Sequence, residues 1–288
     1  MNIVVLSGGG LWAAAGIGMV EALTEMGVPI DGYVGSSAGA VVGALLACGY
    51  APDRLRQVAL SFRARDVRVD WAAWLSSLLR GRWPLSLLRV AQLTRRLDPY
   101  FTGRNWSTLV RPLWVVTTSL TRRQAVVFGS AVPGRYDWGY RLHLAWAHQA
   151  LDLRTALMAS MAVPGLFPPV TDGHEWLVDG GVVDDYPVDV AFWAGATHII
   201  GLWVDEKPEW SMPPRAHVGH VVGAGLTTML RELSVVRQRQ VPVPRTDIRV
   251  EMEGDHRVFD RVADIMDWGY AATQARGREI LAGVDRRA

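Results

Sequence analysis

Apolar and polar residues follow one another in blocks along the first part of the chain, and the blocks have the lengths of strands and helices. Residues 3–6 are a continuous apolar run, typical of a parallel strand buried on both faces. A glycine turn follows, and residues 13–26 predict a helix that Gly27 ends. Residues 31–34 predict a second strand, and the apolar run at 40–48 predicts a second helix. This order indicates the start of a parallel α/β sheet.

The rest of the chain continues this alternation. Further strands are predicted at residues 113–118, 124–128, 176–178, 198–204 and 247–250, and further helices at residues 52–62, 71–93, 153–160, 188–193, 219–240 and 259–281. Residues 205–214 hold three prolines and several charges, which predicts a surface loop. No shift in composition marks a domain boundary, so we expect a single α/β domain over residues 1–288 with a mainly parallel central sheet.

Composition narrows the function classes. The 30 basic and 28 acidic residues nearly balance, which gives no reason to expect nucleic acid as a partner. Cys48 is the only cysteine, so no intrachain disulfide and no cysteine-based metal site is expected. We expect no metal and no cofactor. The N-terminal residues lack the cationic start of a signal peptide, and the apolar stretches are shorter than the roughly 18 residues of a membrane span. These features predict a soluble, cytoplasmic protein.

The segment Gly35-Ser36-Ser37-Ala38-Gly39 has the GxSxG pattern and stands between a predicted strand and a predicted helix. That position is the one a nucleophile elbow occupies, with Ser37 exposed at the start of the helix. The dipole and free N–H groups of a helix N-terminus favour negative charge there. An ordinary Gly/Ser turn is the alternative interpretation of the pattern alone.

Two more glycine motifs accompany the elbow. Ser7-Gly8-Gly9-Gly10 follows the first strand, where successive backbone N–H groups can form an oxyanion hole. The same residues fit a loose dinucleotide pattern, although the expected acidic residue, Asp31, lies at the wrong end of the second strand. Asp179-Gly180-Gly181 follows a short predicted strand and presents a carboxylate on a tight turn; an ordinary surface turn is the alternative.

In this order the motifs resemble those of the patatin-like phospholipases, and the resemblance covers most of the chain. The matching segments are the glycine loop with Gly18 in the helix after it, the elbow at Gly35–Gly39, the stretch from Ser160 to Pro168 that is typical of bacterial members, and the block from Asp179 to Val188. The resemblance implies a three-layer α/β/α fold and a serine lipid acyl hydrolase that cleaves phospholipids or other acyl esters.

The resemblance also implies residue roles. A Ser–Asp dyad of Ser37 and Asp179 would form an acyl-enzyme, and amides of Gly8, Gly9, Gly10 and Ala38 would supply the oxyanion hole. The glycines Gly35, Gly39, Gly180 and Gly181 complete the motifs.

The chain departs from the family pattern at two positions. Trp12 stands where a cation is usual in the glycine loop, and Asp185 stands where Asn is common. These departures keep open a catalytically weak lipid-binding protein with the same fold. A serine esterase that depends on His198 or His256 is the other alternative, because both follow Asp179 in the Ser–Asp–His order.

Residues 71–97 predict a lid or a membrane-docking insertion. Trp71, Trp74 and Trp83 alternate there with leucines at helical spacing, and five arginines stand among them without an acidic residue. Cationic, tryptophan-bearing amphipathic helices suit the bilayer interface. The alternative is a helical hairpin whose apolar stripe packs on the core.

Overall fold

The computed structural model describes residues 1–66, 75, 79–81, 86, 88, 90–130, 144–206, 218–239, 241–252 and 258–285. Within these residues the strands are β1 (Asn2–Leu6), β2 (Gly32–Ser36), β3 (Leu113–Ser119), β4 (Gln124–Gly129), β5 (Leu144–His148), β6 (Val170–Asp172), β7 (Glu175–Asp179), β8 (His198–Glu206) and β9 (Arg245–Met252). The helices are α1 (Ala15–Glu25), α2 (Ser37–Ala47), α3 (Pro52–Ser61), α5 (Val90–Phe101), α6 (Leu153–Ser160), α7 (Val188–Trp193), α8 (Val218–Gln238), α9 (Val262–Ala275) and α10 (Gly277–Asp285). Two 3-10 turns matter below, η1 (Gly10–Ala14) and η5 (Gly180–Val182).

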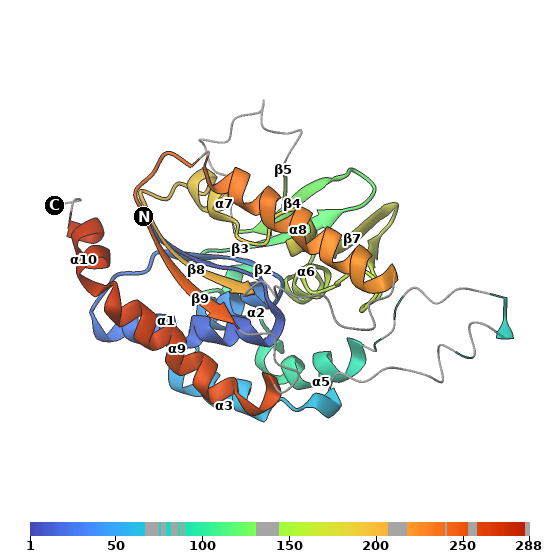
Figure 1. Ribbon diagram of the computed structural model, residues 1–288, viewed down its shortest axis with the longest axis horizontal. Helices are drawn as coiled ribbons and strands as arrows, with labels where there is room; N and C mark the ends of the chain where they lie inside the picture. The colour runs from blue at the N-terminus through green and yellow to red at the C-terminus, as the bar shows by residue number, and fades with distance from the viewer. Residues whose placement is uncertain are drawn as a thin grey trace.

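These strands join one sheet with the order β5-β4-β3-β2-β1-β8-β9 (Figure 1). The central run β3-β2-β1-β8-β9 is parallel throughout, whereas β4 and β7 run antiparallel to β3, and β6 extends the sheet beyond β7. Leu6, the last residue of β1, lies opposite Gly35 of β2 and Leu202 of β8. The carboxyl ends of the central strands therefore meet at one edge, where open α/β sheets carry their sites.

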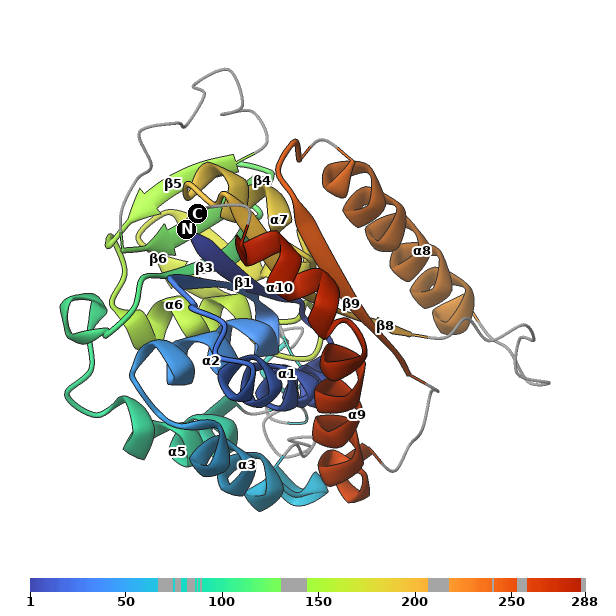
Figure 2. The ribbon, with the colours of Figure 1, turned by 90° about the vertical axis from the view of Figure 1, so that its left-hand side faces the viewer.

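Helices cover both faces of this sheet, as the sequence predicts for an α/β/α fold (Figure 2). Along β1, Val4 and Leu6 face the core beneath α1, α2, α6 and α9, whereas Ile3 and Val5 face the core beneath α7. A strand with apolar residues on both faces is buried on both faces, because successive side chains point to opposite sides. The continuous apolar run of β1 is thereby explained.

Helices α1 and α9 cross at backbone contact. A Cβ added to Gly18 would lie 1.8 Å from the carbonyl oxygen of Met266, and one added to Gly269 would lie 2.0 Å from that of Ala15. No side chain fits at either position, so the two glycines allow the close crossing. This contact couples the C-terminal helices to the helix that follows the glycine loop.

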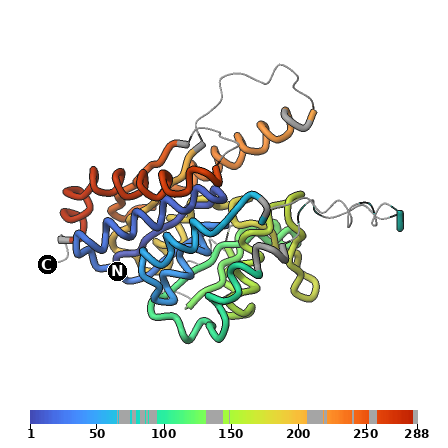
Figure 3. The backbone as a smooth tube through the Cα atoms, turned by 90° about the horizontal axis from the view of Figure 1, so that it is seen from below, coloured from blue at the N-terminus to red at the C-terminus, as the bar shows by residue number. Residues whose placement is uncertain are grey.

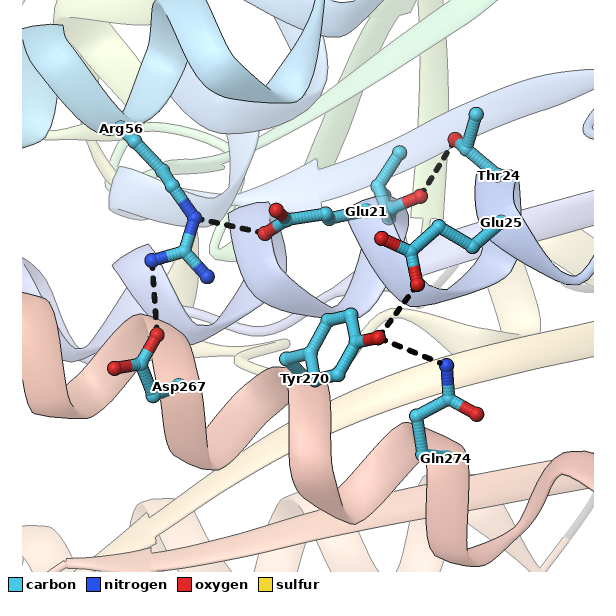
Figure 4. A network of polar contacts seen from close by, with 8 residues as sticks. Glu21, Thr24, Glu25, Arg56, Asp267, Tyr270 and Gln274 are labelled. Atoms are coloured by element: carbon cyan, nitrogen blue, oxygen red, sulfur yellow. Dashed lines mark hydrogen bonds and ion pairs between the residues drawn. The ribbon is translucent and has the colours of Figure 1, made fainter.

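Polar contacts reinforce the crossing at the surface (Figure 4). Arg56 of α3 donates to Glu21 of α1 at 2.7 Å and to Asp267 of α9 at 2.9 Å. Tyr270 of α9 donates to Glu25 of α1 at 2.5 Å. Polar contacts at or near the surface contribute little stability each, so burial of apolar side chains is the larger contribution that holds α1 and α9 together.

The sequence missed or misplaced several elements. Strands β5 and β6 and helix α5 beyond residue 93 were not predicted, and the helix predicted at 259–281 is divided into η6 (Val258–Asp260), α9 and α10. Residues 71–74, 76–78, 82–85, 87 and 89 lie outside the described residues, so the structure does not describe most of the predicted helix at 71–93, nor Trp71, Trp74 and Trp83. The end of that predicted helix, from Val90, belongs to α5. No helix of the described part of the chain has both the length and the hydropathy to cross a membrane.

Candidate active site

Ser37 is the first residue of α2 and follows directly on β2. Its backbone φ is 52°, in the left-handed region that costs a residue other than glycine roughly 1–3 kcal/mol. A Cβ on Gly35 would lie 2.5 Å from Cα of Ala40, and a Cβ on Gly39 would lie 2.3 Å from the carbonyl oxygen of Ser7. Both glycines of the GxSxG pattern are therefore required sterically, and the sharp turn has the geometry expected of a nucleophile elbow.

Asp179 meets Ser37 at this elbow. Ser37 Oγ donates to Asp179 Oδ2 at 2.6 Å, although 142 positions separate the two residues in the chain. The other carboxylate oxygen, Oδ1, accepts from the amide of Gly181 at 2.7 Å, as the N-cap of η5. Thr118 of β3 donates its hydroxyl to the carbonyl of Asp179 at 2.8 Å. The carboxylate is thus fixed on both oxygens and through its own backbone.

Burial sets the charge of this carboxyl group. Removal from water raises the pKa of Asp179 to about 6, and the hydrogen bonds from Ser37 and Gly181 limit the rise because they favour the ionised form. A carboxylate with a pKa near the working pH is a better general base than an ordinary aspartate, because it holds a proton more strongly.

The glycine loop between β1 and η1 lies against the dyad. Gly9 and Gly10 have φ of 112° and 59°, values that favour glycine. The amides of Gly9 and Gly10 make no hydrogen bond with any described residue, and the same holds for Ala38 in the first turn of α2. Three free amides thus stand on the two segments that border Ser37, which is the arrangement expected of an oxyanion hole.

Gly8 departs from the expected donor set. Its amide donates to the carbonyl oxygen of Asp185 at 3.1 Å, so it is not available to a substrate. The residue has a steric role instead, because a Cβ on Gly8 would lie 3.3 Å from Cβ of Ser37 and 2.2 Å from Oδ1 of Asp185. The prediction that Gly8 supplies an oxyanion donor is wrong, and its reason is a long-range backbone pairing that local spacing does not reveal.

Asp185 brings a second carboxyl group to the dyad. A Cβ on Gly181 would lie 3.0 Å from an oxygen of both Asp179 and Asp185. Burial and the neighbouring charges of Asp179 and then Asp205 raise the pKa of Asp185 to about 7, and the nearby Gly8 amide limits the rise because it favours the ionised form. Since like charges this close oppose each other, the two carboxyl groups lose their protons in separate steps.

Two serines that the sequence did not single out hold the site together. The amide of Ser37 donates to Ser160 Oγ at 2.9 Å, and that hydroxyl donates to the carbonyl of Val116 at 2.6 Å. Ser7 Oγ accepts from the amide of Val204 at 2.9 Å and ties the glycine loop to β8. Ser160 begins the segment that resembles bacterial family members, which was the one available signal for its importance.

Trp12 replaces the expected cation with an apolar contact. Its ring stacks on Trp268 of α9 with centroids 6.4 Å apart, and the guanidinium of Arg261 lies 4.8 Å from the centroid of Trp268 on that ring's face. Stacked aromatic pairs of this kind contribute about 0.5–1.5 kcal/mol beyond their buried area. The glycine loop is therefore anchored to α9 through Trp12.

The structure excludes His198 as the base of a histidine-dependent serine esterase. His198 begins β8 opposite Asn2, at the sheet edge away from Ser37, and it is buried with Nε2 3.4 Å from Thr246 Oγ1. A base at that edge cannot reach the serine hydroxyl. His256 lies outside the described residues. Within the described residues no group of three His, Cys, Asp or Glu side chains is arranged to hold a metal ion.

With this geometry established, comparison with known proteins identifies the class. The sequence model of the patatin-like phospholipase family matches residues 4–192, which include the elbow, the glycine loop and the Asp179 turn. The chain therefore belongs to the patatin-like phospholipase family.

Particular relatives and one solved structure agree with this assignment. The chain is 30% identical to patatin-like phospholipase domain-containing protein 6 of Homo sapiens and 29% identical to domain-containing protein 7 of Rattus norvegicus. Each match covers 72% of this chain but only 13% and 14% of those much longer relatives. The crystal structure of VipD from Legionella pneumophila is similar over 96% of this chain and 66% of its own, with a TM-score of 0.51 and 15% identity, which supports the fold alone.

Proposed function

We propose that this chain is a serine lipid acyl hydrolase that cleaves acyl esters through Ser37 and Asp179. The observation that carries the proposal is the 2.6 Å hydrogen bond from Ser37 Oγ to Asp179 Oδ2 on a strained elbow. A hydroxyl on an elbow, hydrogen-bonded to a buried carboxylate beside free amides, is the constellation of nucleophilic ester hydrolysis.

The reaction follows from the contacts. Asp179 Oδ2 takes the proton of Ser37 Oγ as that oxygen attacks the ester carbonyl carbon. The tetrahedral intermediate collapses, the alcohol leaves with the proton from Asp179, and an acyl ester on Ser37 remains. Water then gives a proton to Asp179 and attacks this ester. Ser37 recovers the proton as the fatty acid leaves, and the dyad returns to its starting state.

The developing oxyanion is assigned to the amides of Gly9, Gly10 and Ala38. They border Ser37 and are unused among the described residues. The N-terminus of α2 adds the positive end of the helix dipole at the same place. Loss of one such donor costs roughly 10²–10³ in rate in well-studied hydrolases, so the three amides carry much of the catalysis that a carboxylate base alone does not supply.

Phospholipids or other acyl esters are the proposed substrates. Membership in the patatin-like phospholipase family supports an acyl ester of a lipid, since related chains bear the name phospholipase. The second candidate, a catalytically weak lipid-binding protein, is favoured by one observation, the additional carboxyl group of Asp185 beside the dyad. An anion next to the oxyanion hole opposes the charge that the reaction must develop there.

A fluorophosphonate probe separates the two candidates. It phosphonylates an activated serine, so we expect labelling of the wild type and its loss in Ser37→Ala, together with loss of at least about 10³-fold in the turnover of a short-chain ester. Asp179→Asn is expected to lose turnover similarly, because the amide does not accept the proton.

The control removes the neighbouring hydroxyl of the same motif. Ser36 Oγ is buried and makes no hydrogen bond with described residues, so Ser36→Ala should leave labelling intact. If the wild type fails to react, the hydrolase proposal is wrong and the lipid-binding alternative stands. If Ser37→Ala still reacts, another residue is the nucleophile and the assignment to Ser37 is wrong.

A further inference from the structure

The N-terminal part of α8 stands away from the fold. Residues 218–230, called the α8 tip below, contain no Asp, Glu, Lys or Arg, and their single titratable residue is His220. Every residue from 221 to 229 is exposed. Nine consecutive residues make two and a half turns, so the exposure extends around the whole helix. The large apolar side chains are Val218, Val221, Val222, Leu226 and Met229, with 54% to 78% of their surface exposed.

Nothing described in the chain packs on this part of the helix. A Cβ added to Gly223 or Gly225 would meet no atom within 4 Å. Figures 2 and 3 show α8 leaving the rest of the molecule, with only the end near α7 lying against it. The tip is thus an apolar helix in water, which is an unfavourable arrangement unless another phase or molecule covers it.

The other half of α8 is firmly attached. Arg231 pairs with Asp205 at 2.8 Å, Arg237 pairs with Asp189 at 3.0 Å, and Ser234 is buried. The boundary between free and fixed halves falls where the first charged residue appears. The tip is therefore held at its base in a set direction.

That base lies at the catalytic edge of the sheet. Asp205 follows Val204, whose amide donates to Ser7 Oγ in the glycine loop, and Val204 also contacts the site of Gly9. The carboxyl end of β8 consequently joins the base of the tip to the loop beside Ser37. A surface that covers the tip would lie next to the candidate active site.

The chemistry of the tip favours lipid over protein. The large apolar side chains lie on one side of the α8 tip, and Gly223, Ala224, Thr227 and Thr228 lie on the other. A helix that keeps one face in water usually carries charged residues on that face, whereas no side of the α8 tip carries a charge. Interfacial helices sink about 5–10 Å into a bilayer, close to the diameter of about 10 Å of a helix itself. Thr228 donates to the carbonyl of Ala224 at 2.8 Å and Thr227 donates to that of Gly223 at 3.1 Å, so both hydroxyl groups have partners within the helix.

We propose that the α8 tip inserts into the interface of a lipid bilayer and holds the catalytic edge against it. The inference deepens the proposed function, since it names the surface from which the site would draw its acyl ester, but insertion itself needs no catalysis. It concerns an element other than the tryptophan-bearing segment 71–97.

Vesicle co-sedimentation tests the insertion. Wild type should bind phosphatidylcholine vesicles, and Leu226→Glu combined with Met229→Glu should weaken binding at least about tenfold, because two charges would enter the apolar layer. Val110→Glu is the matched control, since Val110 is 64% exposed and precedes β3 at the opposite edge of the sheet. Unchanged circular dichroism of all variants verifies that they fold.

A second measurement reads the position of the tip directly. Cys48 is buried and is the only cysteine, so Val222→Cys can be labelled selectively with an environment-sensitive fluorophore. Its emission should shift to the blue when phosphatidylcholine vesicles are added, whereas the same label on Val110→Cys should not respond. No shift at position 222, or an equal shift at both positions, overturns the inference.

Further outcomes show whether the α8 tip binds something other than lipid, and whether a failure concerns membrane docking or the proposed hydrolysis. If light scattering reveals a dimer that the double variant splits while vesicle binding stays unchanged, the tip binds a second copy and the inference fails. If no vesicle binding occurs, it also fails. Hydrolysis of a soluble short-chain ester should be unaffected by the double variant, and Ser37→Ala should still bind vesicles. A failure of catalysis is thereby distinguishable from a failure of docking.

Discussion

The dyad and the α8 tip border the same edge of the sheet, yet opposite physical conditions govern them. Around Ser37 the glycines 35 and 39 are required because backbone atoms lie where a side chain would be, and the functional polar groups are fixed by hydrogen bonds. Around Gly223 and Gly225 there is open space. Glycine therefore has two different structural roles in this chain. At the elbow, glycine allows two backbone segments to approach closely. In the α8 tip, no described residue lies near enough for a side chain at the glycine position to clash.

Glycine-to-alanine substitutions in the two regions should differ most in their effect on the free energy of unfolding. In Gly39→Ala the added Cβ would lie 2.3 Å from the carbonyl of Ser7 and 2.4 Å from that of Leu6, and neither backbone atom can yield without moving β1. We expect a loss of at least about 3 kcal/mol in the free energy of unfolding, measured in urea.

The matched substitution is Gly223→Ala. Alanine is favoured over glycine within a helix by about 1 kcal/mol, so this variant should be unchanged or slightly more stable. Equal destabilisation by both substitutions would contradict the contrast between a packed elbow and a free tip.

A hydroxyl deletion should give an intermediate effect. Ser160→Ala leaves the amide of Ser37 and the carbonyl of Val116 without their partner in a buried place, which costs about 1–3 kcal/mol. Thermal or urea unfolding measures this loss, and ester turnover should fall with it because the elbow loses a support. Thr228→Ala removes an exposed hydroxyl in the α8 tip and should change neither quantity. Intact stability in Ser160→Ala would exclude the structural role assigned to this hydroxyl.

The smallest expected effect is on the pH dependence of ester hydrolysis, in which Asp179 and Asp185 should act at different pH values. Asp179 must be ionised to accept a proton, so kcat/KM should fall about tenfold per pH unit below its pKa of about 6. Asp185 is neutral below its pKa of about 7 and becomes an anion beside the oxyanion hole above it. Activity should therefore decline again on the alkaline side, by about tenfold.

Asp185→Asn tests this assignment with the same soluble ester. The acid limb should remain, because it belongs to Asp179, and the alkaline decline should disappear, because the amide cannot ionise. A profile in which Asp185→Asn abolishes the acid limb would reverse the roles of the two groups.

The parts of the site that rest on short segments were predictable. A serine between a strand and a helix with flanking glycines defines the elbow by local sterics, and Asp179 before two glycines defines the opposing turn. The parts that depend on distant partners were not. The amide of Gly8 is occupied by Asp185, and Ser160 reaches Ser37 across 123 positions. No periodicity records such pairings.

The fold divides in the same way. Long apolar strands such as β1 and β8 follow from their composition, since a strand buried on both faces must be apolar throughout. The short strands β5 and β6 depend on pairing with β4 and β7, which only the assembled sheet supplies. The break between α9 and α10 at Arg276 has one local signal, Gly277, whose Cβ would lie 2.9 Å from the sulfur of Met26.

The crossing of α1 and α9 has a practical consequence for anyone trimming this polypeptide. The family match ends at residue 192, yet Gly269, Met266 and Trp268 are what the helix and loop before the elbow rest upon. A shortened version that stops at the family boundary would keep both members of the dyad and lose the scaffold that aims the glycine loop at them. The folded unit that supports the candidate site therefore extends beyond the family match at residues 4–192, because residues of α9 pack against α1 and against Trp12 after the glycine loop.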